Sequence, residues 1–162
     1  MTIRHLDLIR NDRAPAPVPP LIIVGCSAEK TPTERPLPAL ELYNGGCVPA
    51  LRARLGDVPP LRRRVRFLSA LHGLITADTP LEPYDLPLDA ARAEQLRPRV
   101  TKRLYSELAA GVPANVLVIA EPLYLVPLAD LLALPQRPRV HWVPDHAHGW
   151  PQAAAILDSW HR

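Results

Sequence analysis

Apolar residues in this chain occur in short runs that polar or proline-rich stretches separate. Residues 21–24 are apolar at every position, which is typical of a strand covered on both faces of a sheet. Residues 62–70 begin basic and become apolar, and residues 116–120 and 140–143 are further runs of strand length. The pattern therefore predicts four strands.

Between these runs, apolar residues recur at the spacing of an amphipathic helix. In the clearest case, residues 89–110, Pro98 predicts either a kink or a later helix start, and Gly111 predicts the C-terminal cap. The other expected helices span residues 39–55, 123–134 and 152–161. In the first of these, the pair Gly45-Gly46 indicates either a break or a late start near Val48.

Strands that alternate with helices favour a three-layer α/β fold. We expect a mostly parallel central sheet of about four to five strands, flanked by helices in a Rossmann-like arrangement. Residues 1–20 end in a proline-rich stretch and predict an extended N-terminal arm. Residues 21–162 predict a single domain, since this length can bury a substantial core.

Composition adds three expectations. The 21 prolines, about one residue in eight, cluster at the expected connections between elements. The net charge of +3 suits a nucleic acid or a phosphorylated ligand, but we favour the simpler explanation of a G+C-rich coding sequence that supplies arginine, alanine and proline. Two cysteines make no disulfide framework and no apolar run has membrane length, so we expect a cytoplasmic protein without membrane contact.

Candidate chemistry follows the first predicted strand at once. In Cys26-Ser27-Ala28-Glu29-Lys30, a turn would aim backbone amides at an anion, with Ser27 and Lys30 as further donors. Lys30 would also favour the thiolate of Cys26. The alternative is that Cys26 is a small core residue at a strand end.

The second predicted strand leads to Ser69 and His72, a hydroxyl and an imidazole three residues apart. Histidine is the usual proton carrier near neutral pH. Equally, His72 could bind a backbone carbonyl in a turn for which Gly73 supplies the required φ angle.

Carboxylates and phenols accompany two later segments. Glu82, Tyr84 and Asp85 lie on a loop restrained by proline, where fixed carboxylates could bind ribose hydroxyls, stabilise an oxocarbenium ion or simply accept turn hydrogen bonds. Glu121 and Tyr124 follow the third predicted strand. Glu121 could act in a site, complement a helix N-terminus beside a proline, or do both.

The segment Asp145-His146-Ala147-His148 has closely spaced ligand types but no remote partner at a recognised spacing. We therefore expect neither a metal site nor a cofactor. Trp150 beside it could stack on a base or a sugar, or belong to the core.

Several of these segments together resemble an uncharacterised bacterial domain family. Its pattern is roughly CS-x-x-K, then LY, then SA-x-x-GL, then PYD, and the corresponding segments here lie at residues 26–30, 42–43, 69–74 and 83–85. The family is distantly similar to the peroxide-stress protein YaaA. The spacing Cys26-x-x-x-Lys30 also resembles a motif in the lyase domain of archaeosine synthase, which acts on a modified 7-deazaguanine in RNA.

The resemblance implies that Cys26, Tyr43, Ser69 and Gly73 belong with the substrate-binding residues. One position departs from the pattern. Such domains commonly have Ala-Gly-x-x-Tyr after the third strand, whereas this chain has Glu121 in place of the glycine. The change either removes a close backbone approach or adds a catalytic acid.

These features favour an enzyme that cleaves or exchanges an N-glycosidic bond in a nucleoside, nucleotide or modified base. Glu121 or Asp85 would stabilise the sugar cation or activate water, and His72 would move a proton. Ser27 and Lys30 would hold a phosphate or polar ring edge, and Tyr84 and Tyr124 would shape the pocket.

One alternative is a non-catalytic nucleotide- or nucleic-acid-binding module in stress response or DNA maintenance, which the basic residues 62–66 and the basic surface of 89–110 would serve. A thiol-based redox or sulfur-transfer protein that uses Cys26 is a third.

Overall fold

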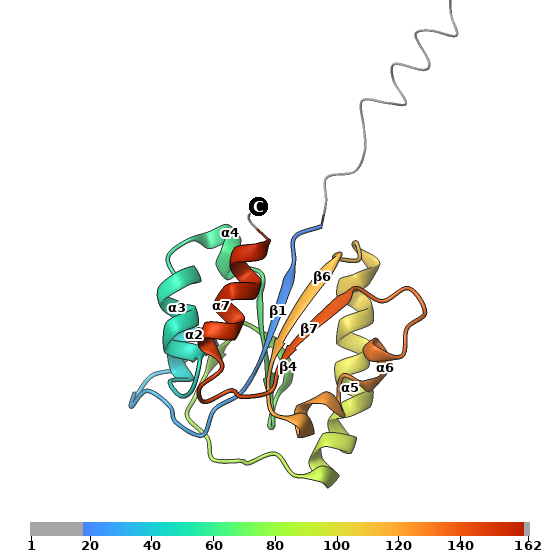
Figure 1. Cartoon of the computed structure of the whole chain (residues 1–162). Helices are drawn as coiled ribbons and strands as arrows, with labels where there is room; N and C mark the ends of the chain where they lie inside the picture. The colour runs from blue at the N-terminus through green and yellow to red at the C-terminus, as the bar shows by residue number, and fades with distance from the viewer. Residues whose placement is uncertain (1–17, 161–162) are drawn as a thin grey trace, which may run out of the picture.

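The computed structural model describes residues 18–160, so the expected N-terminal arm lies almost entirely outside the described residues. Its centre is a five-stranded sheet in the order β4-β3-β1-β6-β7, flanked by helices on both faces (Figure 1). The strands are β1 (Leu21–Gly25), β3 (Val65–Ser69), β4 (Gly73–Thr76), β6 (Asn115–Ile119) and β7 (Arg139–Val143). All neighbouring pairs are parallel except β3 and β4. The expected three-layer α/β fold is confirmed.

The chain winds in two directions from the central strand β1. From β1 it crosses to β3 on one side, and it later returns to β6 on the other side. In such a sheet, the carboxyl ends of the two strands where the winding reverses leave a crevice that commonly binds ligands. Here that crevice lies beyond Gly25 of β1 and Ile119 of β6.

The two faces of the sheet bury separate clusters of side chains. On one face, Ile22 and Val24 of β1 pack in a cluster with residues of α2 (Ala39–Leu42), α3 (Val48–Leu55) and α7 (Trp150–Ser159). On the other face, Ile23 packs in a cluster with residues of α5 (Ala90–Ala109) and α6 (Ala129–Leu132). This alternation explains the continuous apolar run of β1, because both of its faces are covered.

Helix α5 begins at Ala90, where the side chain of Asp89 accepts a hydrogen bond from the backbone N–H of Arg92 at 2.7 Å. The helix continues through Pro98, so the alternative of a start near Pro98 is wrong. Pro98 is exposed, because the buried residues lie on the opposite face. Gly111 follows the C-cap residue with a φ of 149°, as expected of a glycine that ends a helix.

The expected interruption of residues 39–55 is confirmed. Gly46, with a φ of 57°, separates α2 from α3, and α3 begins at Val48. Another expected helix differs from the structure. The expected helix 123–134 is instead a 3₁₀ turn, η1 (Pro122–Leu125), followed by the single turn of α6. Short turns let this segment follow the sheet edge while still burying Leu128 and Leu131.

Some elements had no signal in the hydrophobic pattern. These are β4, the two-stranded antiparallel sheet of β2 (Leu37–Pro38) and β5 (Pro80–Leu81), and the short helix α4 (Pro59–Arg62). They are two to four residues long, which is too short for a repeating hydrophobic pattern to be recognised. Within residues 18–160, no helix has the length and apolar character needed to cross a bilayer.

The buried face of α5 provides a test of the packing. Leu104 is 1% exposed between the helix and the sheet, whereas its neighbour Tyr105 is 48% exposed. We expect Leu104→Ala to lower the free energy of unfolding by about 2–5 kcal/mol, because it leaves a cavity. Tyr105→Ala should change that energy by less than about 0.5 kcal/mol. Urea unfolding followed by circular dichroism measures both; equal effects would contradict this packing.

Candidate functional site

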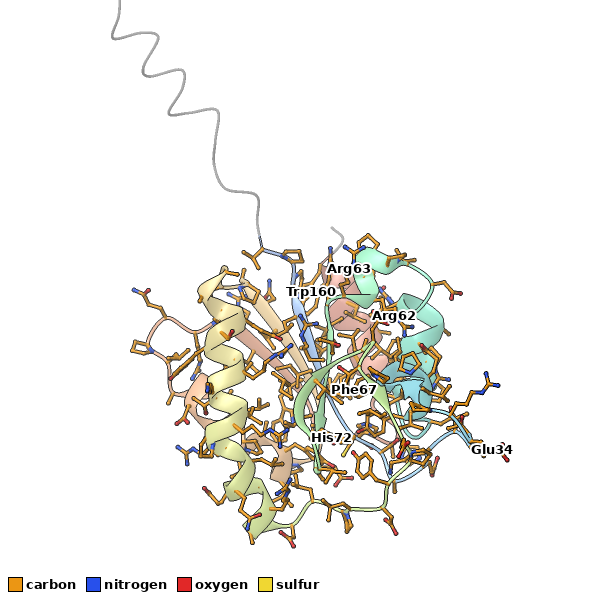
Figure 2. The ribbon with its side chains drawn as sticks, turned by 180° about the vertical axis from the view of Figure 1, so that it is seen from behind. Glu34, Arg62, Arg63, Phe67, His72 and Trp160 are labelled. Carbon is orange, nitrogen blue, oxygen red and sulfur yellow. The ribbon has the colours of Figure 1, made fainter. Side chains whose placement is uncertain are left out.

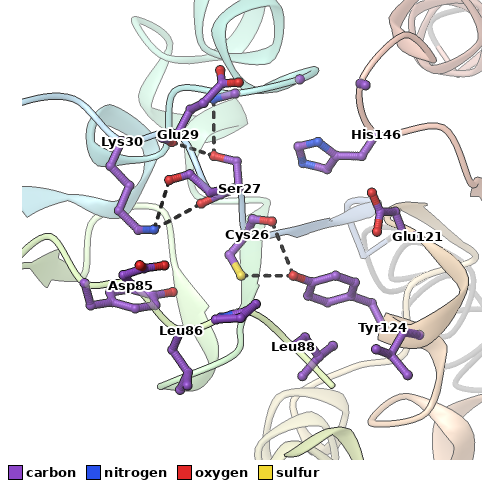
Figure 3. Close-up of a pocket in the computed structure, with 17 residues that line it drawn as sticks. Cys26, Ser27, Glu29, Lys30, Asp85, Leu86, Leu88, Glu121, Tyr124 and His146 are labelled. Atoms are coloured by element: carbon purple, nitrogen blue, oxygen red, sulfur yellow. Dashed lines mark hydrogen bonds between the residues drawn. The ribbon is translucent and has the colours of Figure 1, made fainter. Parts of the chain in front are cut away.

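A hollow of about 340 Å³ lies at the crevice beyond β1 and β6 (Figure 3). Residues after three parallel strands contribute to its lining, namely 26–30 after β1, 121, 123 and 124 after β6, and 146–147 after β7. The turn at Gly45 and Gly46 and the loop 84–88 complete it. Its volume falls within the range of about 300–1,000 Å³ that is usual for small-molecule sites.

The structure brings most of the candidate residues together in this hollow. The candidates that line it are Cys26, Ser27, Lys30, Tyr84, Asp85, Glu121 and Tyr124. Five other candidates do not line it: Tyr43, Ser69, His72, Gly73 and Glu82. The candidates in the hollow lie up to 98 positions apart in the sequence, from Cys26 to Tyr124, so the fold alone assembles them.

Tyr43 and Ser69 lie behind the hollow, where both are fully buried and hold Tyr84 in place. The Tyr84 hydroxyl is 2.6 Å from Ser69 Oγ and 2.5 Å from the Tyr43 hydroxyl. The Tyr43 ring in turn packs against Phe67 of β3 with a centroid distance of 5.0 Å. Two of the candidates therefore support a third.

The hydrogen bonds of this hydroxyl cluster can be assigned by counting. Ser69 Oγ accepts from the backbone N–H groups of Leu71 and His72 at 3.2 and 3.0 Å, so its own O–H donates to Tyr84. One tyrosine then donates to the other, and one phenolic hydrogen remains without an acceptor in the cluster. Burial raises the pKa of Tyr43 to about 12 and raises that of Tyr84 as well, so both phenols stay protonated donors at neutral pH.

Cys26 and Tyr124 join the ends of the two central strands. Cys26 Sγ lies 3.2 Å from the Tyr124 hydroxyl, which is also 3.4 Å from the Cys26 carbonyl oxygen. The close approach of the strands depends on Gly25, since a Cβ there would lie 3.2 Å from Cβ of Ala120. Burial raises the pKa of the Tyr124 phenol, which stays neutral at physiological pH.

Lys30 supplies the cation of the site. Its ammonium group donates to the carbonyl oxygens of Ser27 and Ala28 at 3.2 and 3.4 Å, and lies 4.5 Å from the centroid of the Tyr84 ring. Such a position over an aromatic face is favourable for a cation. In the part of the chain that the structure describes, Lys30 forms no ion pair with a carboxylate. Its charge is therefore available to an anionic ligand.

Three carboxylate residues line the hollow, and two of them, Glu121 and Asp85, were candidates from the sequence. Glu121 follows β6 and Asp85 belongs to the loop after β5, and both are exposed. In Figure 3, Glu121 lies beside His146 on one wall, and Asp85 lies near Lys30 on the other. Neither Asp85 nor Glu121 has an ion pair or hydrogen bond with another side chain among residues 18–160. Both are therefore free to interact with a ligand.

His146 is a residue of the site that sequence reasoning considered only as a metal ligand. Its Nε2 donates to the carbonyl oxygen of Gly25 at 2.9 Å, which ties the segment after β7 to the end of β1. Gly46 packs against its ring, since a Cβ at Gly46 would lie 2.2 Å from Nδ1. The exposed Asp145 and His148 form a local turn instead. Within residues 18–160, no three side chains of metal-ligand type gather in one place.

His72 lies outside the hollow, low on the edge of the sheet that β4 forms (Figure 2). Its ring contacts Tyr84 edge-on with a centroid distance of 5.4 Å, so Tyr84 separates it from the hollow. Gly73 has a φ of 74°, as its expected turn requires. Glu82 is exposed away from the hollow, and Trp150 packs against the core rather than presenting a stacking surface.

One protein family matches the part of the chain that forms the sheet and most of the hollow. Residues 21–143, from the start of β1 to the end of β7, match a family described as "Family of unknown function (DUF6884)". The chain belongs to this family. The expected membership of an uncharacterised domain family is thereby confirmed. No curated protein and no solved structure matches the chain. The DUF6884 match includes every segment that lines the hollow except the one that carries His146.

Burial of His146 predicts a pH dependence of stability. Burial lowers the pKa of His146, so the unfolded chain takes up the proton first as the pH falls. The neutral His146 ring therefore favours the folded state at pH values above the ordinary histidine pKa of about 6.5. This contribution to the free energy of unfolding is lost as the pH falls through the lowered pKa of the folded state. We expect His146→Gln, which keeps an N–H donor but does not titrate, to lose less free energy of unfolding between pH 7.5 and pH 5.

Urea unfolding at a series of pH values measures this difference. Part of the remaining slope belongs to His72, whose pKa is lowered by burial and by the nearby Arg99. Identical slopes for the wild-type protein and His146→Gln would show that His146 is not held in its neutral form.

Proposed function

We propose that this protein is an enzyme that acts on a nucleoside, nucleotide or modified base, by cleavage or exchange of an N-glycosidic bond. The observation that carries the proposal is the pair of free carboxylates, Glu121 and Asp85, that face one hollow together with the ammonium group of Lys30. Paired carboxylates around a sugar are the usual means of stabilising an oxocarbenium-like transition state. A cation in the same hollow suits a phosphate or a departing base.

The proposed reaction breaks the bond between the anomeric carbon and a base nitrogen, and the bonding electrons leave with the base. Glu121 stabilises the positive charge that develops on the sugar, and Asp85 holds a ribose hydroxyl or the attacking water. Water or an incoming base then forms the new bond to the anomeric carbon, and the proton that it loses passes to the departing base, directly or through Asp85. The reaction needs no oxidant or reductant.

Lys30 stabilises negative charge in the proposed reaction. Its ammonium can hold a phosphate of the substrate or stabilise the electron-rich edge of the departing base, with Ser27 beside it. This role replaces the proton transfer expected of His72, because Tyr84 lies between His72 and the hollow. His146 acts as a positioning residue through its bond to Gly25.

The resemblance of the motifs supports the same class of substrate. Cys26 and Lys30 of the Cys-x-x-x-Lys spacing both line the hollow, as do Tyr84 and Asp85 of the PYD motif. We take the distant similarity to YaaA and to the archaeosine synthase lyase domain as support for a ligand related to a nucleobase. The alternative without chemistry, a nucleotide-binding module, uses the same hollow and differs only in lacking turnover.

Base release tests the proposal directly. The protein is incubated with a panel of nucleosides, nucleotides and 7-deazapurine derivatives, and free base is measured by chromatography. We expect release from at least one member of the panel. Glu121→Gln should lower kcat by about 10²–10⁴-fold, because it removes the negative charge next to the sugar.

The matched control is Glu82→Gln, which removes a carboxylate from the same loop as Asp85 but outside the hollow. It should keep at least half of the wild-type activity. Binding without release from any member would favour the non-catalytic module. Turnover that Glu121→Gln leaves unchanged would remove the proposed mechanism.

A further inference from the structure

A second hollow, of about 400 Å³, lies between β4 and α5, on the other side of Tyr84 from the strand-end hollow. Its polar lining is basic and comes from His72, Arg99, Lys102 and Arg103, with the hydroxyl of Ser106 beside them. Nothing in the proposed glycosidic chemistry uses these residues. We call this feature the β4–α5 groove.

Two cations of the groove have no internal partner. Most other arginines that make the sequence basic are occupied: Arg62 pairs with Glu41 and Asp78, Arg66 with Glu107, and Arg97 with Asp130. Arg92 donates instead to the carbonyl oxygens of Ala70 and Leu71. By contrast, Arg99 and Lys102 form no ion pair or side-chain hydrogen bond within residues 18–160, and both are exposed.

The groove is net positive, because no carboxylate of residues 18–160 is part of its lining. Glu107 lies one turn beyond Arg103, but its carboxylate already bonds to Arg66 at 2.9 Å and to Arg103 at 3.1 Å. Burial lowers the pKa of His72, and the positive charge of the nearby Arg99 lowers it further. The backbone turn at Gly73 lies close under Arg99, since a Cβ there would be 3.6 Å from Cδ of Arg99. The sheet edge and the helix therefore present one positive surface.

An exposed aromatic ring outside the lining of the groove lies next to Lys102, one of the two free cations. Tyr105 is 48% exposed and stands three residues after Lys102 on α5, which makes the two side chains neighbours on the helix surface. An exposed tyrosine beside a positive groove can stack on a base, and every base offers such a face. Carboxylates of an acidic peptide or a free phosphate would have no use for this ring.

We propose that the β4–α5 groove binds a single strand of nucleic acid, with Arg99 and Lys102 on backbone phosphates and Tyr105 stacked on a base. Arg99 and Lys102 lie one helical turn apart, so they can contact separate phosphates of the same strand. This site is distinct from the strand-end hollow and does not depend on the chemistry proposed there. It gives a role to the only two α5 cations of the groove that the fold leaves free among residues 18–160.

Fluorescence anisotropy with dye-labelled dT12 tests the proposal at 50 and 200 mM NaCl. We expect the double variant Arg99→Glu/Lys102→Glu to weaken binding at least tenfold at 50 mM NaCl. Replacement by alanine at both positions should reduce the slope of log K against log salt by about 1.4, because two phosphate contacts are lost. Tyr105→Ala should weaken binding at least fivefold without changing that slope.

The matched control is Arg35→Glu/Arg139→Glu, which changes the net charge equally at two exposed positions away from the groove. It should alter the affinity for dT12 by less than threefold. Circular dichroism confirms that each variant is folded, and the single variants Arg99→Ala and Lys102→Ala replace any double variant that is not.

Three results would overturn the proposal. These are no binding of dT12 at 50 mM NaCl, equal losses in the groove and control variants, and binding of a labelled oligoglutamate peptide as tight as that of dT12 and insensitive to Tyr105→Ala. Competition by inorganic phosphate at millimolar concentration, as effective as unlabelled dT12 at equal phosphate concentration, would also contradict a strand. The base-release assay uses small substrates, so its outcome is separate.

Discussion

The parallel pairing of β1 with both β3 and β6 determines where the strand-end hollow forms and which residues line it. Ile23 of β1 is opposite Arg66 of β3 and Val118 of β6, and this register brings the three strands to an end at the same level. Polar residues lie at or just beyond the end of each strand: Ser69 ends β3, Cys26 follows β1, and Glu121 comes two residues after β6. The register therefore determines that the thiol of Cys26, the carboxylate of Glu121 and the hydroxyl of Ser69 lie within one small region.

Around that region the protein holds its side chains through buried contacts rather than through surface ion pairs. Gly25 lets the strand ends approach, His146 ties β7 to the carbonyl of Gly25, and the Tyr43–Tyr84–Ser69 cluster fixes the opposite wall. The charged residues of the hollow, Glu29, Lys30, Asp85 and Glu121, form no side-chain ion pair within residues 18–160. Because the surrounding contacts hold the site in place and its charged groups are unpaired, a ligand can bind without a costly rearrangement of the protein.

The sequence predicted the sheet and the long helix better than the short elements and the loops. The strand at β1 and the long helix α5 were recognisable because their apolar residues follow a regular period over enough positions. The residues of the hollow could be anticipated in part, because polar groups after parallel strands converge at one edge of the sheet. Cys26, Lys30 and Glu121 satisfy this rule.

His72 and His146 show where that rule ends. His72 also follows a strand, but the antiparallel turn into β4 takes it behind Tyr84. His146 enters the hollow because of a turn after β7 and the positive φ of Gly46, and neither is visible in a hydrophobic pattern. Whether an arginine forms an ion pair also depends on the folded structure. The difference between the paired Arg97 and the unpaired Arg99 of α5 could therefore not be predicted from the sequence.

The strand-end hollow is proposed to bind a nucleoside, nucleotide or modified base. Amide chemical shifts in ¹H–¹⁵N spectra, recorded during titration with each member of the base-release panel, measure this binding. We expect saturable shifts that are largest in the non-proline residues of 26–30, 84–88, 121–124 and 146–147, for at least one member. Shifts confined to other parts of the protein, or none at millimolar concentration for any member, would show that the hollow is not the ligand site.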